Sequence, residues 1–198
     1  MLGKAHLTIG MAAAWTLAMP ETMPAALPVI AGAAAGSLVC DIDCDSPRER
    51  QDASRQRILA VLITAAALIA DKLSDAGMWR SLAQSGSYLW CAGIAGFVLT
   101  LAFANVSAHR GFSHSLTALA LETFCVYLIF PQCALPFAAA FISHILLDMT
   151  NKKRVRLFYP AKKGVSLGLF YADRLANRVC EIAGTAWLIL VIWVSTGN

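Results

Sequence analysis

Charged residues are scarce in this chain of 198 residues, where Asp, Glu, Lys and Arg make up 14% of the total against about 25% in typical soluble domains. Low charge excludes an intrinsically disordered protein, because disorder requires high charge and low hydrophobicity. Six cysteines are too few for a disulfide-stapled secreted scaffold. The apolar fraction of 58% and the mean hydropathy of +0.62 indicate an integral membrane protein. At this length we expect one domain covering residues 1–198.

Apolar runs that approach the length of a membrane span recur along the chain. A hydrocarbon layer about 30 Å thick requires about 20 helical residues. We therefore predict an all-α, polytopic transmembrane bundle of about seven spans: Ala5–Met19, Pro24–Cys40, Arg57–Ala70, Ser87–Ala104, His114–Phe130, Gln132–Met149 and Val179–Val194. Pro131 and Pro136 are expected to mark the turn between the fifth and sixth spans. The first run is interpreted as a retained span and not as a cleaved signal, because His6 fits the site described below.

Basic residues are distributed unequally between the two ends of this predicted bundle. Fourteen of the sixteen lie at the end that holds the N-terminus, segments 41–56, 105–113 and 150–178, and Arg57 at the start of the third span, whereas Lys72 and Arg80 lie at the other end. The positive-inside rule makes the first end cytoplasmic. We therefore predict a multi-pass protein of the bacterial inner (cytoplasmic) membrane with a cytoplasmic N-terminus.

A basic segment follows the sixth predicted span. Lys152–Arg156 and Lys162–Lys163 are typical either of nucleic-acid contact or of an anionic headgroup layer. Because the segment adjoins a span and contains Leu157–Tyr159, we favour membrane lipids as partners and expect no nucleic acid. Apolar spacing further predicts an interfacial helix over Val165–Val179. This stretch and the short third span leave six or eight spans as alternatives to seven.

All four histidines lie near the predicted cytoplasmic end, and each is close to another residue that can bind a metal. The candidates are His6 in the first span, Asp41 and Asp43 after the second, His109 and His114 before the fifth, and His144 and Asp148 at the end of the sixth. The spans were drawn from hydropathy, so this convergence is independent support for one site. Ionisable groups at the edge of a span are costly and are functional candidates by default.

Two of the spacings indicate how these side chains can meet. His144 and Asp148 are four residues apart, so they share one face of a helix and can bind one ion or form a pair. His109 and His114 would diverge on a continuous helix. We therefore expect a turn at Gly111 that lets them converge.

The two aspartates after the second span favour a cation. Asp41 and Asp43 project to the same side of an extended chain, and carboxylates that close repel each other unless a cation or a proton lies between them. Seven candidate ligands exceed the four of a tetrahedral zinc site. Either two ions are bound, or some of the seven support the ligands and supply a general base.

Hydrolysis is the natural use of such a site. A bound divalent ion, with zinc expected, lowers the pKa of its water to about 7 and provides a nucleophile for an ester, amide or phosphodiester. We predict His109, His114, His144 and one of the two aspartates as ligands. The other aspartate would be the general base, for which Asp43 is chosen. Arg110 would stabilise a developing oxyanion or anchor to headgroups.

Several nearby residues have two interpretations. Ser113 and Ser115 are either nucleophiles or helix caps, and we favour caps. Glu122 lies at hydrocarbon depth, where it is protonated or lines a polar cavity. Cys44 is either a soft metal ligand or a free thiol, and we favour the free thiol.

These residues resemble those of the YdjM-type inner-membrane proteins of bacteria and archaea, described as metal-dependent hydrolases and in some members regulated by LexA. The similar segments are Gly3–His6, Gly36–Asp43, His109–Ser115, Ser143–Asp148 and Thr150 with the run to Tyr159-Pro160. His109–Ser115 is the most specific. The resemblance spans most of the chain and implies a hydrolase reaction class without naming a substrate.

Two positions depart from the family pattern of proline-aspartate-x-aspartate-histidine-proline. Cys40 stands in place of the first proline and Cys44 in place of the histidine. The second change implies either an altered metal preference or a position that is not a ligand.

A fainter resemblance concerns the zinc-dependent phospholipase C and P1-type nucleases, in which HxxxD or HxxxE pairs hold metals. His144 and Asp148 look like one such pair. This likeness implies a phosphodiester substrate, including a lipid, at the headgroup layer. The basic segment after Thr150 would then hold its phosphate.

Two other functions use the same residues. A metal-ion or proton transporter would continue the path inward through Glu122, and a non-catalytic membrane scaffold would use the polar residues to tie helix ends together. Because the candidates cluster at one end of the bundle, a membrane-embedded metal-dependent hydrolase with its site at the cytoplasmic face is favoured.

Overall fold

The computed structural model describes residues 3–44, 47–169, 171 and 174–197, and this part of the chain is helical with irregular connections. The helices are α1 (Gly3–Ala18), α2 (Met23–Leu38), α3 (Pro47–Ser74), α4 (Met78–Gln84), α5 (Ser87–Val106), α6 (Leu116–Ile129), α7 (Pro131–Thr150) and α8 (Arg174–Ser195). Two short 3-10 turns, η1 (Val39–Asp43) and η2 (Phe112–His114), lie between them. The all-α prediction is therefore confirmed for the described residues.

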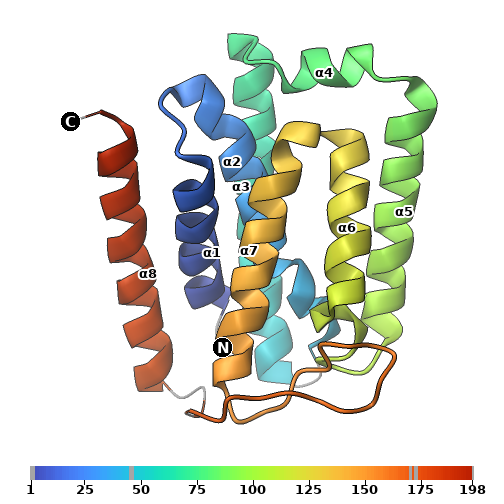
Figure 1. Cartoon of the computed structure of the whole chain (residues 1–198), viewed down its shortest axis with the longest axis vertical. Helices are drawn as coiled ribbons and strands as arrows, with labels where there is room; N and C mark the ends of the chain where they lie inside the picture. The colour runs from blue at the N-terminus through green and yellow to red at the C-terminus, as the bar shows by residue number, and fades with distance from the viewer. Residues whose placement is uncertain (1–2, 45–46, 170, 172–173, 198) are drawn as a thin grey trace.

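The long helices run side by side along one axis, and α4 lies across one end of the bundle (Figure 1). The N-terminus, η1, η2 and segment 151–169 lie at the opposite end. A hydrogen bond from the Gly3 N–H to Asp52 in α3 ties the chain start to that end. The Arg156 N–H donates to the Arg110 carbonyl, so two predicted loops of this end are in direct contact.

In the part of the chain that the structure describes, four segments are long and apolar enough to cross a membrane, namely Met23–Asp43, Ser87–Val106, Pro131–Thr150 and Arg174–Ser195. The other three predicted spans fall in α1, α3 and α6. With 16 and 14 residues, α1 and α6 are shorter than the roughly 20 that a span requires. The 28-residue α3 begins with a polar stretch. The apolar helices fit membrane insertion, and four of the seven predicted spans meet the length and hydropathy of a span in the described residues.

Small residues let α2 and α7 approach closely in the centre of the bundle. A Cβ atom on Gly36 would lie 2.2 Å from the Phe137 carbonyl oxygen, so a larger residue does not fit without a shift. Gly10 of α1 is similarly close to Ser37 of α2. Close approach at such small residues is typical of membrane helix packing. It draws the ends of α1, α2 and α7 together where the candidate site lies.

The interfacial helix predicted over Val165–Val179 is wrong for the described residues before Arg174, where α8 begins. Val155 and Val165 exchange two backbone hydrogen bonds of 2.8 Å, and the N–H groups of Leu167 and Leu169 donate to the end of α7. A backbone whose donors are already used by another segment does not form its own helical bonds. Residues 170, 172 and 173 of the predicted helix lie outside the described residues.

The turn between the fifth and sixth predicted spans forms at Phe130, and Pro131 is the first residue of α7. Proline is well suited to this position, because the first N–H groups of a helix have no intrahelical partner. Pro136, which was predicted to mark the same turn, instead lies inside α7.

Candidate metal centre

Asp41 reaches the centre from η1, the turn that continues α2. Its Oδ1 lies 3.6 Å from Nε2 of His144 in α7. The close packing of α2 against α7 places the two residues opposite each other. Both are buried, so the contact is shielded from solvent.

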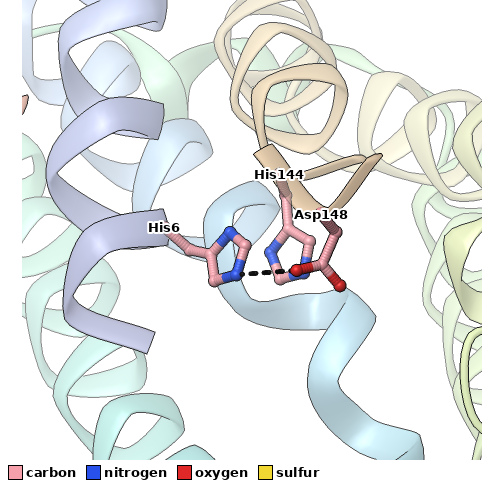
Figure 2. A group of neighbouring side chains, drawn as sticks. All are labelled: His6, His144 and Asp148. Atoms are coloured by element: carbon pink, nitrogen blue, oxygen red, sulfur yellow. Dashed lines mark ion pairs between the residues drawn. The ribbon is translucent and has the colours of Figure 1, made fainter. Parts of the chain in front are cut away.

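His6, His144 and Asp148 come together from α1 and α7, as Figure 2 shows. The imidazole rings of His6 and His144 are stacked, with centroids 3.7 Å apart and an interplanar angle of 12°. Nε2 of His6 lies 3.5 Å from Oδ1 of Asp148. The predicted pairing of His144 and Asp148 on one helix face therefore extends to a third residue from another helix.

His114 enters from the loop between α5 and α6. The predicted turn at Gly111 is present, with the Gly111 N–H donating to the Ala108 carbonyl, and the left-handed residue of this turn is Arg110 at φ 59°. Nε2 of His114 lies 3.4 Å from Oδ2 of Asp148. The ring centroids of His109 and His114 are 5.8 Å apart, so the two histidines converge as expected.

The donor set fits a divalent cation. Two groups of side chains offer one ligand atom each within 4.8 Å of one another: His6, His144 and Asp148 in one, and Asp41, His114 and His144 in the other. Among the described residues, the buried Nδ1 and Nε2 of His6 and the buried Nε2 of His114 and of His144 have no hydrogen-bond partner. Buried polar atoms are nearly always paired. Unpaired imidazole nitrogens beside carboxylates are the arrangement that metal binding explains.

Hydrogen bonds to the histidine rings indicate which ring nitrogen of each could bind a metal. Nδ1 of His144 lies 2.5 Å from the Ser37 carbonyl oxygen, which only accepts, so Nδ1 carries a proton and the neutral ring has its lone pair on Nε2. Nδ1 of His114 lies 2.8 Å from Oγ of Ser113. The Ser113 hydroxyl donates to Asp43 at 2.5 Å, so Nδ1 of His114 is the donor to Ser113 and its Nε2 is left bare. Such a partner on the second nitrogen is what orients a metal-binding histidine.

Asp43 organises the loop that carries His114. Its carboxylate accepts the Ser113 hydroxyl, the Arg110 backbone N–H at 3.1 Å and the ring of His109 at 2.8 Å. Burial acts to lower the pKa of His109, but the hydrogen bond and the charge of Asp43 outweigh it and raise the pKa above its usual value. Asp43 and His109 therefore border the centre without belonging to either ligand group.

Arg110 lies directly against the centre. Its Nη2 is 2.9 Å from Oδ2 of Asp148, and its Nη1 donates to the Lys153 carbonyl at 3.0 Å. Nε of Arg110 is buried and has no hydrogen-bond partner among the described residues. The guanidinium is therefore held beside the ligand cluster, and its Nε–H can still donate a hydrogen bond to a bound molecule.

The structure thus brings five of the seven predicted residues into one cluster, while Asp43 and His109 form a second layer behind His114. Ser115 caps α6 as expected, accepting from the Ala118 N–H. Ser113 was also expected to be a cap and instead links Asp43 to His114.

The Ser37 carbonyl was missed by sequence reasoning. A main-chain acceptor carries no residue-specific signal, so nothing in the sequence could have identified it.

The cysteines and Glu122 do not join the cluster. Cys40 packs among apolar side chains that include Phe112 and Phe141. In the described part of the chain, neither ligand group includes Cys44. Glu122 is buried in α6, and its Oε2 has no partner among the described residues.

Comparison with known proteins adds one finding. No curated protein and no solved structure matches the chain. The model of the family described as YdjM inner membrane protein matches residues 1–197, almost the whole chain. With its apolar helices and this match, the chain belongs to the YdjM inner membrane protein family.

Proposed function

We propose that this protein is a membrane-embedded metal-dependent hydrolase in which His6, Asp41, His114, His144 and Asp148 hold one or two divalent cations, with zinc expected. The observation that carries the proposal is the set of buried imidazole nitrogens without partners beside two carboxylates. A divalent cation bound there lowers the pKa of coordinated water and so supplies the nucleophile that hydrolases use. Histidine nitrogen and carboxylate oxygen are the donor types of known catalytic zinc sites.

The residues around the cluster have positioning and charge-stabilising roles in this proposal. Asp43 was predicted as a general base, but its carboxylate already accepts three hydrogen bonds from the loop that carries His114. We propose instead that Asp43 orients His114 through Ser113. Arg110, with its Nε available, stabilises negative charge that develops on the substrate.

The same proposal includes the orientation of the chain. It also includes the number of spans, because α1, α3 and α6 together with the four long apolar segments make seven. The shorter helices would then cross the membrane beside the longer ones. The excess of basic residues at the end that carries the cluster supports a cytoplasmic location for that end and for the N-terminus.

An ester or phosphodiester, including that of a lipid, is the proposed substrate. The basic segment supports it, because Arg156 and Lys153 are hydrogen bonded through their backbones to Arg110 beside the cluster. A cationic segment at the edge of a bilayer attracts anionic headgroups. The substrate bond would therefore be presented at the depth of the headgroups.

The test is metal content together with metal-dependent hydrolysis of detergent-solubilised phospholipids and model esters by the purified full chain. We expect near-stoichiometric metal in the wild type and its loss in His144→Ala, along with any hydrolysis. Ser143→Ala is the matched control, because Ser143 neighbours His144 but donates to the Ala140 carbonyl outside the cluster. Wild-type protein that binds no divalent metal after reconstitution would refute the proposal.

A further inference from the structure

A polar cavity of about 350 Å³ is lined in part by η1, the turn that also carries Asp41 of the metal centre. Arg50, Ser54 and Arg57 of α3, Asp43 of η1 and Asn105 at the end of α5 line it. Oδ2 of Asp43 also lies 3.9 Å from Nδ1 of His114. The cavity therefore borders the candidate centre without sharing its five ligand residues.

The α3 side of this cavity presents two guanidinium groups. Arg50, Ser54 and Arg57 are spaced four and three residues apart, so they share one helix face. Nε of Arg50 donates to the Cys44 carbonyl at 2.7 Å, while Arg57 donates to the Ala53 carbonyl and the Ser54 hydroxyl. A guanidinium has five donors, and the bonds that Arg57 makes to described residues use two. The two arginines are thus held in place with donors remaining for an anion.

An apolar cavity of about 380 Å³ neighbours the polar one. It lies between α2, α3 and α5, and both cavities include Ile42 and Arg57 in their walls. Along α3 it extends from Arg57 to Leu68, about 16 Å at 1.5 Å per residue. Its walls are formed by side chains such as Val61 and Phe97. A cationic pocket that shares a wall with an elongated apolar pocket matches the charged head and the hydrocarbon tail of an amphiphile.

We propose that these two neighbouring cavities bind one anionic phospholipid, with its phosphate at Arg50 and Arg57 and an acyl chain between α2, α3 and α5. Two arginines against the single carboxylate of Asp43 give the polar cavity a net positive charge. Arginine forms charge-assisted, often bidentate hydrogen bonds with phosphate. The apolar continuation selects a ligand with a hydrocarbon tail over free phosphate.

The site goes beyond the proposed hydrolase activity, because none of its contacts requires a metal. Its position also couples it to the centre through one residue. Asp43 faces the phosphate pocket and at the same time holds the loop of His109, Arg110 and Ser113. A lipid bound here would therefore lie one side chain away from the groups that orient His114.

Native mass spectrometry of the metal-stripped full chain in detergent tests the binding directly. The probes are dioleoyl phosphatidylglycerol, which has head and tails, glycerol phosphate, which has the head alone, and diolein, which has the tails alone. We expect retention of phosphatidylglycerol well above the other two. Because the protein is metal-free, a failure of the hydrolase proposal would leave this result unchanged, and the two outcomes are distinguishable.

Substitutions on α3 locate the site. We expect Arg57→Gln and Arg50→Gln each to weaken phosphatidylglycerol binding about tenfold, the loss of roughly one charge-assisted hydrogen bond. Ala65→Trp, which fills the apolar cavity, should weaken it by a similar factor. Arg55→Gln is the matched control, since Arg55 is exposed on the same helix and lines neither cavity. Equal weakening by Arg55→Gln, unchanged binding in the cavity variants, or glycerol phosphate binding as tightly as the lipid would overturn the proposal.

Discussion

Each end of the bundle buries an aspartate, and the two are satisfied in opposite ways. Asp71 of α3, 1% exposed, accepts the backbone N–H groups of Met78 and Trp79 at 3.1 and 3.2 Å and so holds the start of α4. Asp148, equally buried, faces His6 and His114, whose nearest nitrogens have no hydrogen-bond partner among the described residues. The comparison teaches that burial of a carboxylate does not by itself indicate function. The proposed function rests instead on the imidazole nitrogens near Asp148 that have no hydrogen-bond partner among the described residues.

The largest expected effect separates the two aspartates by metal binding. At a concentration one hundred times its Kd, zinc should stabilise the wild type by about 3 kcal/mol, because it binds only the folded chain. Asp148→Ala should lose this stabilisation, whereas Asp71→Ala should keep it. Thermal unfolding in detergent with zinc and with EDTA measures the difference. Equal zinc stabilisation of the two variants would show that the comparison carries no functional meaning.

The second effect concerns the support behind His114. Ser113→Ala removes the hydroxyl that connects Asp43 to Nδ1 of His114. Loss of a group that orients a ligand typically costs about 10- to 100-fold in metal affinity. Competition with a zinc-binding dye measures the change. An unaltered affinity would mean that His114 is oriented by packing alone.

The third effect is on stability at the other end of the bundle. Asp71→Ala leaves the N–H groups of Met78 and Trp79 without their acceptor, which should lower the free energy of unfolding by about 2 kcal/mol. Metal content should stay at the wild-type level. Mild-detergent unfolding monitored by tryptophan fluorescence measures the change, and a variant as stable as the wild type would show that solvent or lipid headgroups replace Asp71.

The smallest effect provides a local control for the second. Ser115→Ala removes the cap of α6, whose hydroxyl accepts from the Ala118 N–H at 3.1 Å. The expected loss is about 1 kcal/mol in stability, with zinc affinity unchanged. Ser113 and Ser115 lie two residues apart. If zinc affinity falls only in Ser113→Ala and stability falls only in Ser115→Ala, Ser113 supports metal binding and Ser115 supports the helix.

Much of the candidate centre could be predicted because its signals are local. The i, i+4 spacing of His144 and Asp148 needs only a helix, and hydropathy places His6 and Asp41 at the same end. The interfacial helix failed for a non-local reason, since Val165 and Leu167 bond to segments earlier in the chain. The polar cavity of the proposed lipid site was missed because Arg50 and Arg57 look like ordinary charges of a solvated helix until α5 and η1 close the space around them.

By itself, the sequence determined the membrane class, the helical bundle and the residue types of the centre, because hydropathy and helical periodicity act over short distances. The tertiary structure alone decided how these groups face one another. Close contact of α2 with α7 at Gly36 positions Asp41 beside His144 and brings the Ser37 carbonyl to Nδ1 of the same ring. Which imidazole nitrogens remain bare depends on those partners, and partners more than a hundred residues apart are chosen by packing, which no local pattern encodes.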